Sequence, residues 1–321
     1  MQKIISYGPE AWNLLQGVFC VYKPFDMTMS HLRKVLIGNL TRDLNMLEPR
    51  PALPHIVIEG NTAEDLVVVK KENYADHPLV IGPRYQADDY KLSYAIHLHK
   101  NISGVCLMGV NRGTKGTLVA RAGRLIRSYS LGGRLGMATN TGYFDAKVVT
   151  KSTYHHVTKA RLLKTLMHIQ GGFQQSAFHF LGLDPQSQAA YEAMSAEGLV
   201  RPGEKSPPLV YNIKLVEFSS PDFTIEVSCI NENGEFLQHL VHKIGLQLKT
   251  NAVCTQMRCV RYGPWTLQHA LLRKHWTLKH IIDNVSVCNP LIKDITPKSP
   301  SLQHVGSESL DNSIPRLKHA Q

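Results

Sequence analysis

The spacing of apolar and polar positions predicts an alternation of strands and helices, typical of an α+β protein. Strands are predicted over residues 17–24, 55–60, 66–71, 93–99, 105–110, 127–136, 209–218, 222–230 and 252–265. Helices are predicted over residues 28–40, 117–126, 158–172, 184–198 and 234–248. The first helix has Thr28 or Ser30 as its N-cap, and the third is expected to end at a pair of glycines.

This pattern divides the chain into three parts. Residues 17–288 carry the periodic segments and are expected to form one folded domain. Residues 1–16 precede it as an N-terminal extension. Residues 289–321 are rich in Ser, Pro and Lys and lack periodicity, so a disordered tail is expected there. The short tail leaves no separate C-terminal RNA-binding domain in this interpretation.

Charge narrows the class of partner. The net charge is +11, and the excess lies in two stretches that contain no acidic residue, 90–144 and 236–282. If the fold brings these stretches together, they make one positive surface. Such a surface usually binds a phosphate backbone, so RNA or DNA is favoured over chance clustering on a solvated face.

Other classes receive less support. No run approaches the ~18 apolar residues that a membrane span needs. The six cysteines form no Cys-x-x-Cys pair and follow no secretory signal, which favours reduced thiols inside a cell. The first 17 residues are poor in basic residues, so no clear transit peptide is present.

The turn between the strands at 93–99 and 105–110 is the most informative stretch. It reads Ile96-His97-Leu98-His99-Lys100-Asn101-Ile102-Ser103-Gly104. On a strand, His97 and His99 point the same way, as metal ligands do, but no cysteine or carboxylate lies near them with zinc spacing. The adjacent pair His155-His156 also has no cysteine or carboxylate near it with zinc spacing. No metal and no cofactor is therefore predicted.

Five motifs in order resemble the TruB-type pseudouridine synthases, and within them the mitochondrial mRNA members. The segments are GVFCVYKPFDMTMSHLRKV with its Lys23-Pro24 turn, HLHKNISGVCLMGVNRGTK, RSYSLGGRLGMATNTGYFD, AAYEAMSAEGLVRP and NGEFLQHLVHKIGLQLKTNAVCTQMRCVRYGPW. The resemblance covers residues 17–288. It implies a pseudouridine-synthase-like fold with a central, mostly antiparallel sheet flanked by helices, an RNA substrate and a mitochondrial location.

The resemblance also exposes two departures from the family pattern. In that family an aspartate four residues before the Ser-Gly pair attacks the uridine, and an arginine of the later helix pairs with it. Here these positions hold His99 and Gln238. A carboxylate is charged at neutral pH and is a good leaving group, whereas histidine titrates near pH ~6.5. Residues 90–144 supply no carboxylate in its place, so the pair is expected to be a neutral replacement for the charged one.

Further site residues follow from the same match. Tyr129 corresponds to the tyrosine that stacks on the target base and assists proton removal, and Phe236 to an aromatic position of the later helix. The expected RNA-binding residues are Lys23, Lys100, Arg112, Lys115, Arg121, Arg124, Arg127, Phe236, Arg258 and Arg261.

Three functions stay open at this point. The first is an RNA-binding homologue with impaired catalysis that acts in mitochondrial RNA metabolism. The second is an active isomerase that makes pseudouridine in mitochondrial mRNA, rRNA or tRNA. The third is a protein scaffold with a vestigial basic cleft. Partners are expected to be RNA and proteins of mitochondrial RNA granules or ribosome assembly.

Overall fold

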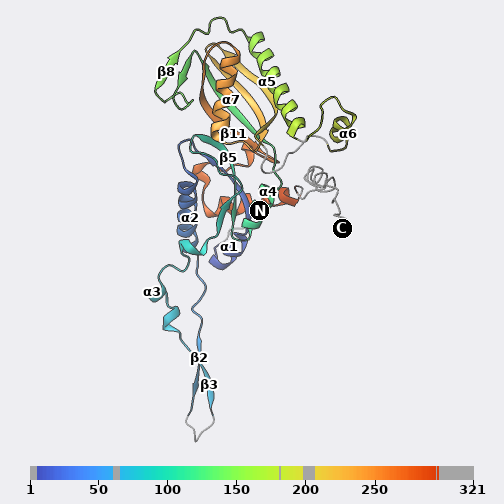
Figure 1. Cartoon of the computed structure of the whole chain (residues 1–321). Coiled ribbons are helices and arrows are strands. Elements are labelled where there is room, and N and C mark those ends of the chain that lie inside the picture. Colours follow the sequence, from blue (N-terminus) through green and yellow to red (C-terminus); the bar gives the residue numbers. More distant parts are fainter. Residues whose placement is uncertain (1–5, 61–65, 181, 198–206, 294, 296–321) are drawn as a thin grey trace, which may run out of the picture.

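The predicted strands assemble into one central sheet. The computed structural model describes residues 6–60, 66–180, 182–197, 207–293 and 295, and in this part of the chain the sheet has eight strands (Figure 1). They are β1 (Gly17–Lys23), β4 (Leu92–Tyr94), β5 (Ile102–Val110), β6 (Arg127–Leu135), β9 (Leu209–Ser219), β10 (Asp222–Ile230), β11 (Ala252–Tyr262) and β12 (Trp265–Thr266).

The sheet is antiparallel except at one position. Its order is β1-β5-β11-β6-β10-β9, with β4 on β5 and β12 on β11. Only β5 and β11, among these described strands, run parallel, and they pair over Ile102–Gly104. This confirms the expected mixed α+β fold with a central, mostly antiparallel sheet.

Several helices flank the sheet. The helices of the described residues are α1 (Gly8–Leu14), α2 (Met29–Asn45), α3 (Pro78–Ile81), α4 (Gly113–Ala122), α5 (Lys159–Phe180), α6 (Gln188–Glu197), α7 (Gly234–Gln247), α8 (Leu278–Cys288) and α9 (Pro290–Lys293). Helix α5 packs on β9 and α7 on β11, while α4 packs on β5 and α8 on β1. The short 3₁₀ helices are 74–76, 87–89, 267–269 and 273–275.

Helix α2 shows how the sequence pattern sets the packing. The Thr28 hydroxyl accepts a hydrogen bond from His31 N at 3.2 Å, which confirms it as the N-cap. The leucines that follow at four-residue intervals all have no exposed surface: Leu32, Leu36, Leu40 and Leu44. Because residues four apart share a helical face, this side of α2 is buried in the core.

Three expectations need correction. Residues 96–99 form a loop instead of a strand. The reason is that β11 pairs with β5 at Ile102–Gly104, so β4 pairs with β5 only at the other end of that strand, at Met108–Val110. Helix α5 continues through Gly171 and Gly172, since both glycines lie in open space and neither adopts a left-handed backbone. The second predicted helix, 117–126, begins earlier, at Gly113, and ends at Ala122.

The ends of the chain also differ from expectation. Residues 8–14 of the supposed extension form α1, whose Ala11 has no exposed surface and whose Gly8 N donates to Glu48 O at 2.8 Å. This helix is part of the packed body. The expected tail begins with the short helix α9, and residues 296–321 lie outside the described part of the chain.

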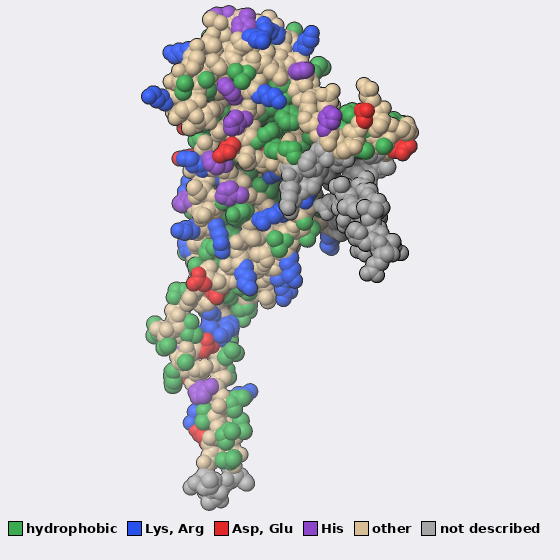
Figure 2. All heavy atoms as spheres, viewed as in Figure 1, with side chains coloured by type: hydrophobic (Ala, Val, Ile, Leu, Met, Phe, Trp, Pro, Cys, Tyr) green, Lys and Arg blue, Asp and Glu red, His purple; other side chains and the backbone are tan. Residues whose placement is uncertain are grey.

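Two small hairpins lie outside the central sheet. One joins β7 (Met137–Thr139) to β8 (Val148–Lys151), and the other joins β2 (His55–Glu59) to β3 (Val67–Lys71). The second hairpin, which we call the arm, projects away from the body (Figure 1). Its apolar side chains are largely exposed, as the space-filling view shows (Figure 2): Ile56, Ile58, Leu66, Val67 and Val68.

One carboxylate fixes the segments at the base of the arm. Asp76 accepts from Arg50 Nη1 at 2.8 Å, from Arg84 Nη1 at 3.0 Å and from Leu53 N at 2.7 Å. Hydrogen bonds from Arg50 come first among the causes that hold the pKa of this carboxyl well below its usual range. These contacts therefore fix the segments from which the arm projects.

Candidate functional site

The loop before β5 is held by a buried lysine. Lys23 ends β1 and has no exposed surface. Its ammonium donates to the carbonyl oxygens of Pro24, His99, Lys100 and Ile102, at 3.2, 3.1, 3.2 and 2.7 Å. Within the loop, Ile102 N donates to His99 O at 3.0 Å, which closes a tight turn. One side chain thus sets the backbone path around His99.

The Ser-Gly pair joins the same loop to β11. Gly104 has a φ of +115°, and a Cβ there would lie 2.0 Å from Cys259 O on β11. Only glycine tolerates both the backbone conformation and this approach. Ser103 is buried and its hydroxyl donates to Met257 O at 3.3 Å. The motif is therefore explained by the parallel pairing of β5 with β11.

The burial of Lys23 corrects its expected role in RNA binding. An ammonium that is enclosed and donates to four carbonyl oxygens is not available to a phosphate. Burial lowers the pKa of Lys23 to about 8, with Cys106 and Asp26 opposing that change. Lys23 is a structural residue that positions the loop.

Replacing Lys23 by methionine is expected to destabilise the protein by ~2–4 kcal/mol, because carbonyl oxygens in and around the loop lose their donor. Urea unfolding followed by circular dichroism measures the change. The matched control is Lys100→Met in the same loop, where the side chain is exposed and the effect should stay within ~0.5 kcal/mol. Equal stability of the two variants would contradict the structural role.

His99 and Gln238 line one cleft, as the family resemblance requires. The cleft, which we call the His99 cleft, has a volume of about 870 Å³. His99 is exposed and Gln238 is half-buried. A Cβ on Gly234 would lie 3.2 Å from His99 Cβ, so the start of α7 packs against the loop. Gln238 is one turn farther along and shares that helical face.

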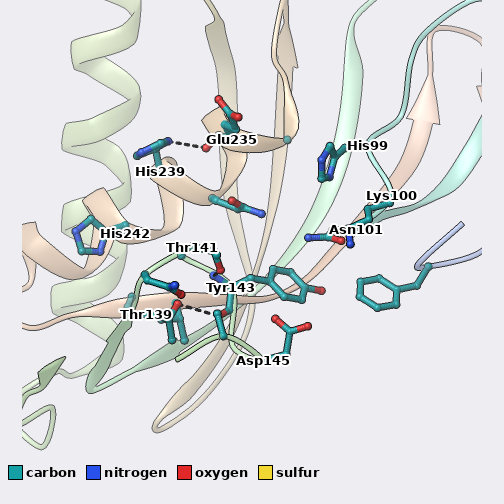
Figure 3. Close-up of a pocket in the computed structure, with 18 of the residues that line it drawn as sticks. His99, Lys100, Asn101, Thr139, Thr141, Tyr143, Asp145, Glu235, His239 and His242 are labelled. Atoms are coloured by element: carbon teal, nitrogen blue, oxygen red, sulfur yellow. Dashed lines mark hydrogen bonds between the residues drawn. The ribbon is translucent and has the colours of Figure 1, made fainter. Parts of the chain in front are cut away.

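The walls of this cleft come from distant segments. Figure 3 shows His99, Lys100 and Asn101 on one side, opposite Glu235, His239 and His242 of α7. Tyr143 and Asp145 lie between them in this view. The lining mixes polar and apolar side chains and carries both signs of charge.

The fold supplies carboxylates that the sequence order concealed. Asp26, Asp145 and Glu235 are exposed and line the His99 cleft, although residues 90–144 contain none. Asp26 has a φ of +58°, and its N–H donates to Lys100 O at 2.9 Å. Residues 90–144 supply no carboxylate, as expected, but the cleft receives three from other segments.

Tyr129 lies beside a buried acid that sequence reasoning missed. Its hydroxyl donates to Glu232 Oε1 at 2.5 Å, and the side chain is 1% exposed. Arg127 Nε lies 2.7 Å from the same oxygen, but its N–H does not point along that contact. Burial raises the pKa of Glu232, and Arg127 and Tyr129 oppose this rise.

These three residues line a second, smaller cavity of about 210 Å³, which we call the Glu232 pocket. His99 and Gly234 belong to both this pocket and the His99 cleft. Tyr129 lines this pocket and does not line the larger cleft.

Three of the expected RNA-binding arginines come together. Arg121, Arg124 and Arg127 line a cavity of about 430 Å³, the arginine pocket. It shares Ile96, His97 and Arg127 with the Glu232 pocket. The three cavities therefore adjoin in the order His99 cleft, Glu232 pocket, arginine pocket, and His99 and Arg127 lie at the two junctions.

The remaining predicted residues lie elsewhere. Phe236 packs edge-on against Phe173, with ring centroids 5.8 Å apart, and lines none of these three cavities. Arg112, Lys115 and Arg261 are exposed outside them, and Arg258 is half-buried. The RNA-binding role expected of Phe236 therefore has no support from these cavities.

Among the described residues, no group of three or more His, Cys, Asp or Glu side chains is arranged to hold a metal ion. Within the same ranges, no helix has the length and apolar character to cross a membrane. The six cysteines are free and buried.

Comparison with known proteins gives consistent matches. The model of the TruB family pseudouridylate synthase (N terminal domain) matches residues 84–234. Human "Pseudouridylate synthase TRUB2, mitochondrial" is 37% identical over 92% of this chain and 90% of its own length. The mouse protein of that name is 36% identical over 92% and 91%.

A solved structure is similar to this chain at a lower sequence identity. The crystal structure of the archaeal box H/ACA sRNP Nop10-Cbf5 complex contains a chain that matches 89% of this one at 14% identity, with a TM-score of 0.47. The match spans 61% of that chain. The sequence relatives carry the assignment: the chain belongs to the TruB family of pseudouridylate synthases.

Proposed function

We propose that the protein binds RNA as a TruB homologue whose isomerase chemistry is impaired. The observation that carries this proposal is that His99 and Gln238, neither a carboxylate nor a guanidinium, line one cleft. These are the positions where the family resemblance expects an aspartate and its arginine. The supports of the loop remain in place, because Lys23 and Gly104 fix its backbone.

The surface around the cleft suits RNA. The net charge is +11, and the adjoining cavities give a path from the His99 cleft to three arginines. Phosphates are held by arginines through charge-assisted contacts, and a flipped base needs a ring-sized cavity. An RNA strand with one unpaired nucleotide satisfies both requirements.

The proposed setting is mitochondrial RNA metabolism. The relatives that match over nine-tenths of the chain are described as mitochondrial pseudouridylate synthases. We therefore propose mitochondrial mRNA, rRNA or tRNA as the partner, with proteins of RNA granules or ribosome assembly as further partners.

The experiment measures binding and isomerisation on the same sample. The purified chain is incubated with structured, uridine-containing mitochondrial RNA, binding is followed by fluorescence anisotropy, and pseudouridine is counted by mass spectrometry. Binding without pseudouridine is expected. Pseudouridine formation by the unmodified chain would instead show an active isomerase that uses another acid of the cleft. Absence of binding at low salt would favour the scaffold function.

The salt dependence of binding tests the electrostatic part. The double variant Arg121→Gln, Arg124→Gln is expected to lower the slope of log K against log salt by about 1–2, because fewer counterions are released. Arg161→Gln with Lys164→Gln removes the same charge from α5 and should leave the slope closer to that of the unmodified chain. Equal slopes for both pairs would exclude the arginine pocket from the RNA path.

A further inference from the structure

We infer that the arm is a dimerisation surface whose partner is the arm of a second copy of this chain. One face of the β2–β3 hairpin packs against the same face of the other copy, and the two arms run antiparallel. This inference goes beyond the proposed RNA binding and does not depend on it, since the arm lines none of the three cavities.

The pairing register gives the arm two faces of different character. Val57 lies opposite Val69, and Ile58 lies opposite Val68. Because successive residues of a strand point to opposite faces, the two pairs belong to different faces. The face with the second pair, which we call the open face, consists of Ile56, Ile58, Leu66, Val68 and Lys70.

An ion pair covers the other face, which we call the closed face. Lys71 and Glu59 form this pair. Each lies two positions beyond one valine of the Val57–Val69 pair, at opposite ends, so the two side chains meet across the valines. Both valines are half-buried. The closed face thus supplies its own cover.

The open face has no such cover within the described part of the chain. Its four apolar side chains are between 64% and 67% exposed and form a patch on the projecting arm (Figure 2). Large exposed apolar patches mark interaction sites, and a lone two-stranded hairpin is marginally stable in water. The arm therefore lacks one apolar layer.

The open face complements itself when two arms pack antiparallel. A two-fold axis at its centre sets the Ile58–Val68 pair of each copy against that of the other. Lys70, near the base of each arm, then lies at the end away from the second Lys70, so the like charges stay apart. Covering both faces removes roughly 1,000 Å² in total, the lower limit for a specific interface.

The length of the arm keeps the two charged bodies apart. Each strand has five residues, and antiparallel packing places the bodies at opposite ends of the joined arms (Figure 1). Five residues span ~17 Å. Since charges beyond ~8 Å are largely screened at physiological salt, the net charge of +11 on each chain permits contact through the arms.

Sedimentation equilibrium of the unmodified chain without RNA, over about 1–200 μM, tests the inference first. A dimer with a dissociation constant of ~10–100 μM is expected from the small apolar area, and added salt should strengthen it. A chain that stays monomeric overturns the inference. If that monomer floats with phosphatidylcholine vesicles, the open face belongs to a lipid surface instead.

A matched pair of variants assigns the contact to the arm. Val68→Asp places a charge in the interface and should weaken the dimer at least ~10-fold. Val149→Asp is the control, because Val149 is 66% exposed on β8 of the other small hairpin. Equal dissociation constants for the two variants overturn the inference.

Crosslinking separates the two faces without adding a charge. The natural cysteines are buried, so a short bis-maleimide reagent reacts with introduced thiols. Val68→Cys on the open face should yield a covalent dimer, whereas Val67→Cys on the closed face should yield little. Equal yields at these adjacent positions would show that the arms do not meet through the open face, which also overturns the inference.

Discussion

A chain that carries both His99→Asp and Gln238→Arg is expected to form pseudouridine in RNA, where the unmodified chain forms none. The first change supplies a carboxylate on the loop that Lys23 already holds. The second supplies the guanidinium from the facing side of α7. The pair restores the charges that the family resemblance expects at these positions, on a backbone that needs no rearrangement.

The single variants should be weaker. His99→Asp alone leaves its carboxylate opposite a neutral amide, and Gln238→Arg alone adds a cation without an anion at position 99. Because His99 is exposed, the missing partner should cost ~1–3 kcal/mol, which corresponds to ~10- to 100-fold in rate for His99→Asp against the double variant. The chain with Gln238→Arg alone should form no pseudouridine.

Mass spectrometry of nuclease-digested RNA measures the product in all four chains. His99→Asn with Gln238→Arg serves as the matched control, since it offers a similar shape without a nucleophile. If the double variant binds RNA but stays inactive, the loss of activity extends beyond these two residues. Activity in the asparagine control would show that the carboxylate at position 99 is not the source.

The free energy of unfolding is expected to fall steeply above about pH 9, because the cysteine thiols are enclosed. Burial raises the pKa of Cys106, Cys254 and Cys259 from 9.0 to about 12 each. A thiol whose pKa is higher in the folded state contributes stability below the unfolded pKa. That contribution is lost as the pH rises from the unfolded value toward the folded one.

The size of this loss is large. Each such thiol should lower the free energy of unfolding by ~1.4 kcal/mol per pH unit between about pH 9 and 12. The three thiols together should therefore lower it by ~4 kcal/mol by pH 10. Domains are commonly stable by only ~5–15 kcal/mol. Lys23 acts in the opposite direction from about pH 8 upward, because its pKa is lowered, but it is a single group.

Urea unfolding between pH 7 and 11 in the presence of a reductant measures the slope. Cys254→Ala should reduce the slope by about one proton, because one buried thiol no longer ionises on unfolding. A variant at an exposed position, such as Lys214→Gln, is the control and should leave it unchanged. An identical slope in Cys254→Ala would show that the thiols do not control the alkaline loss.

Local pattern was enough to predict most of the fold. Continuous apolar runs indicated β1 and the later part of β5, and leucines every four residues indicated the buried face of α2. The loop at residues 96–99 escaped prediction because its alternation is typical of a strand, while the decisive fact is the pairing of β11 with β5. Strand pairing between distant segments has no local signature.

The site was predictable only in part, for the same reason. The loop with His99 and the helix with Gln238 followed from motifs. Lys23 was interpreted as a surface cation, since a lysine before a proline gives no sign that four carbonyl oxygens surround it. Glu232 meets Tyr129 from 103 positions away. No local signal distinguishes it from Glu235, the acid that directly precedes the acid-free stretch 236–282.

The arm has a consequence for how separate copies of the protein meet in solution. Its two strands expose valine and isoleucine side chains and leave one edge of each strand unpaired. Such an edge favours association with the arm of another copy. The net charge of +11 opposes that encounter by repulsion, and salt shortens its range to ~8 Å at physiological strength. Colloidal stability and RNA release therefore depend on salt in opposite ways: the concentrations that free the protein from RNA are those at which it self-associates most readily.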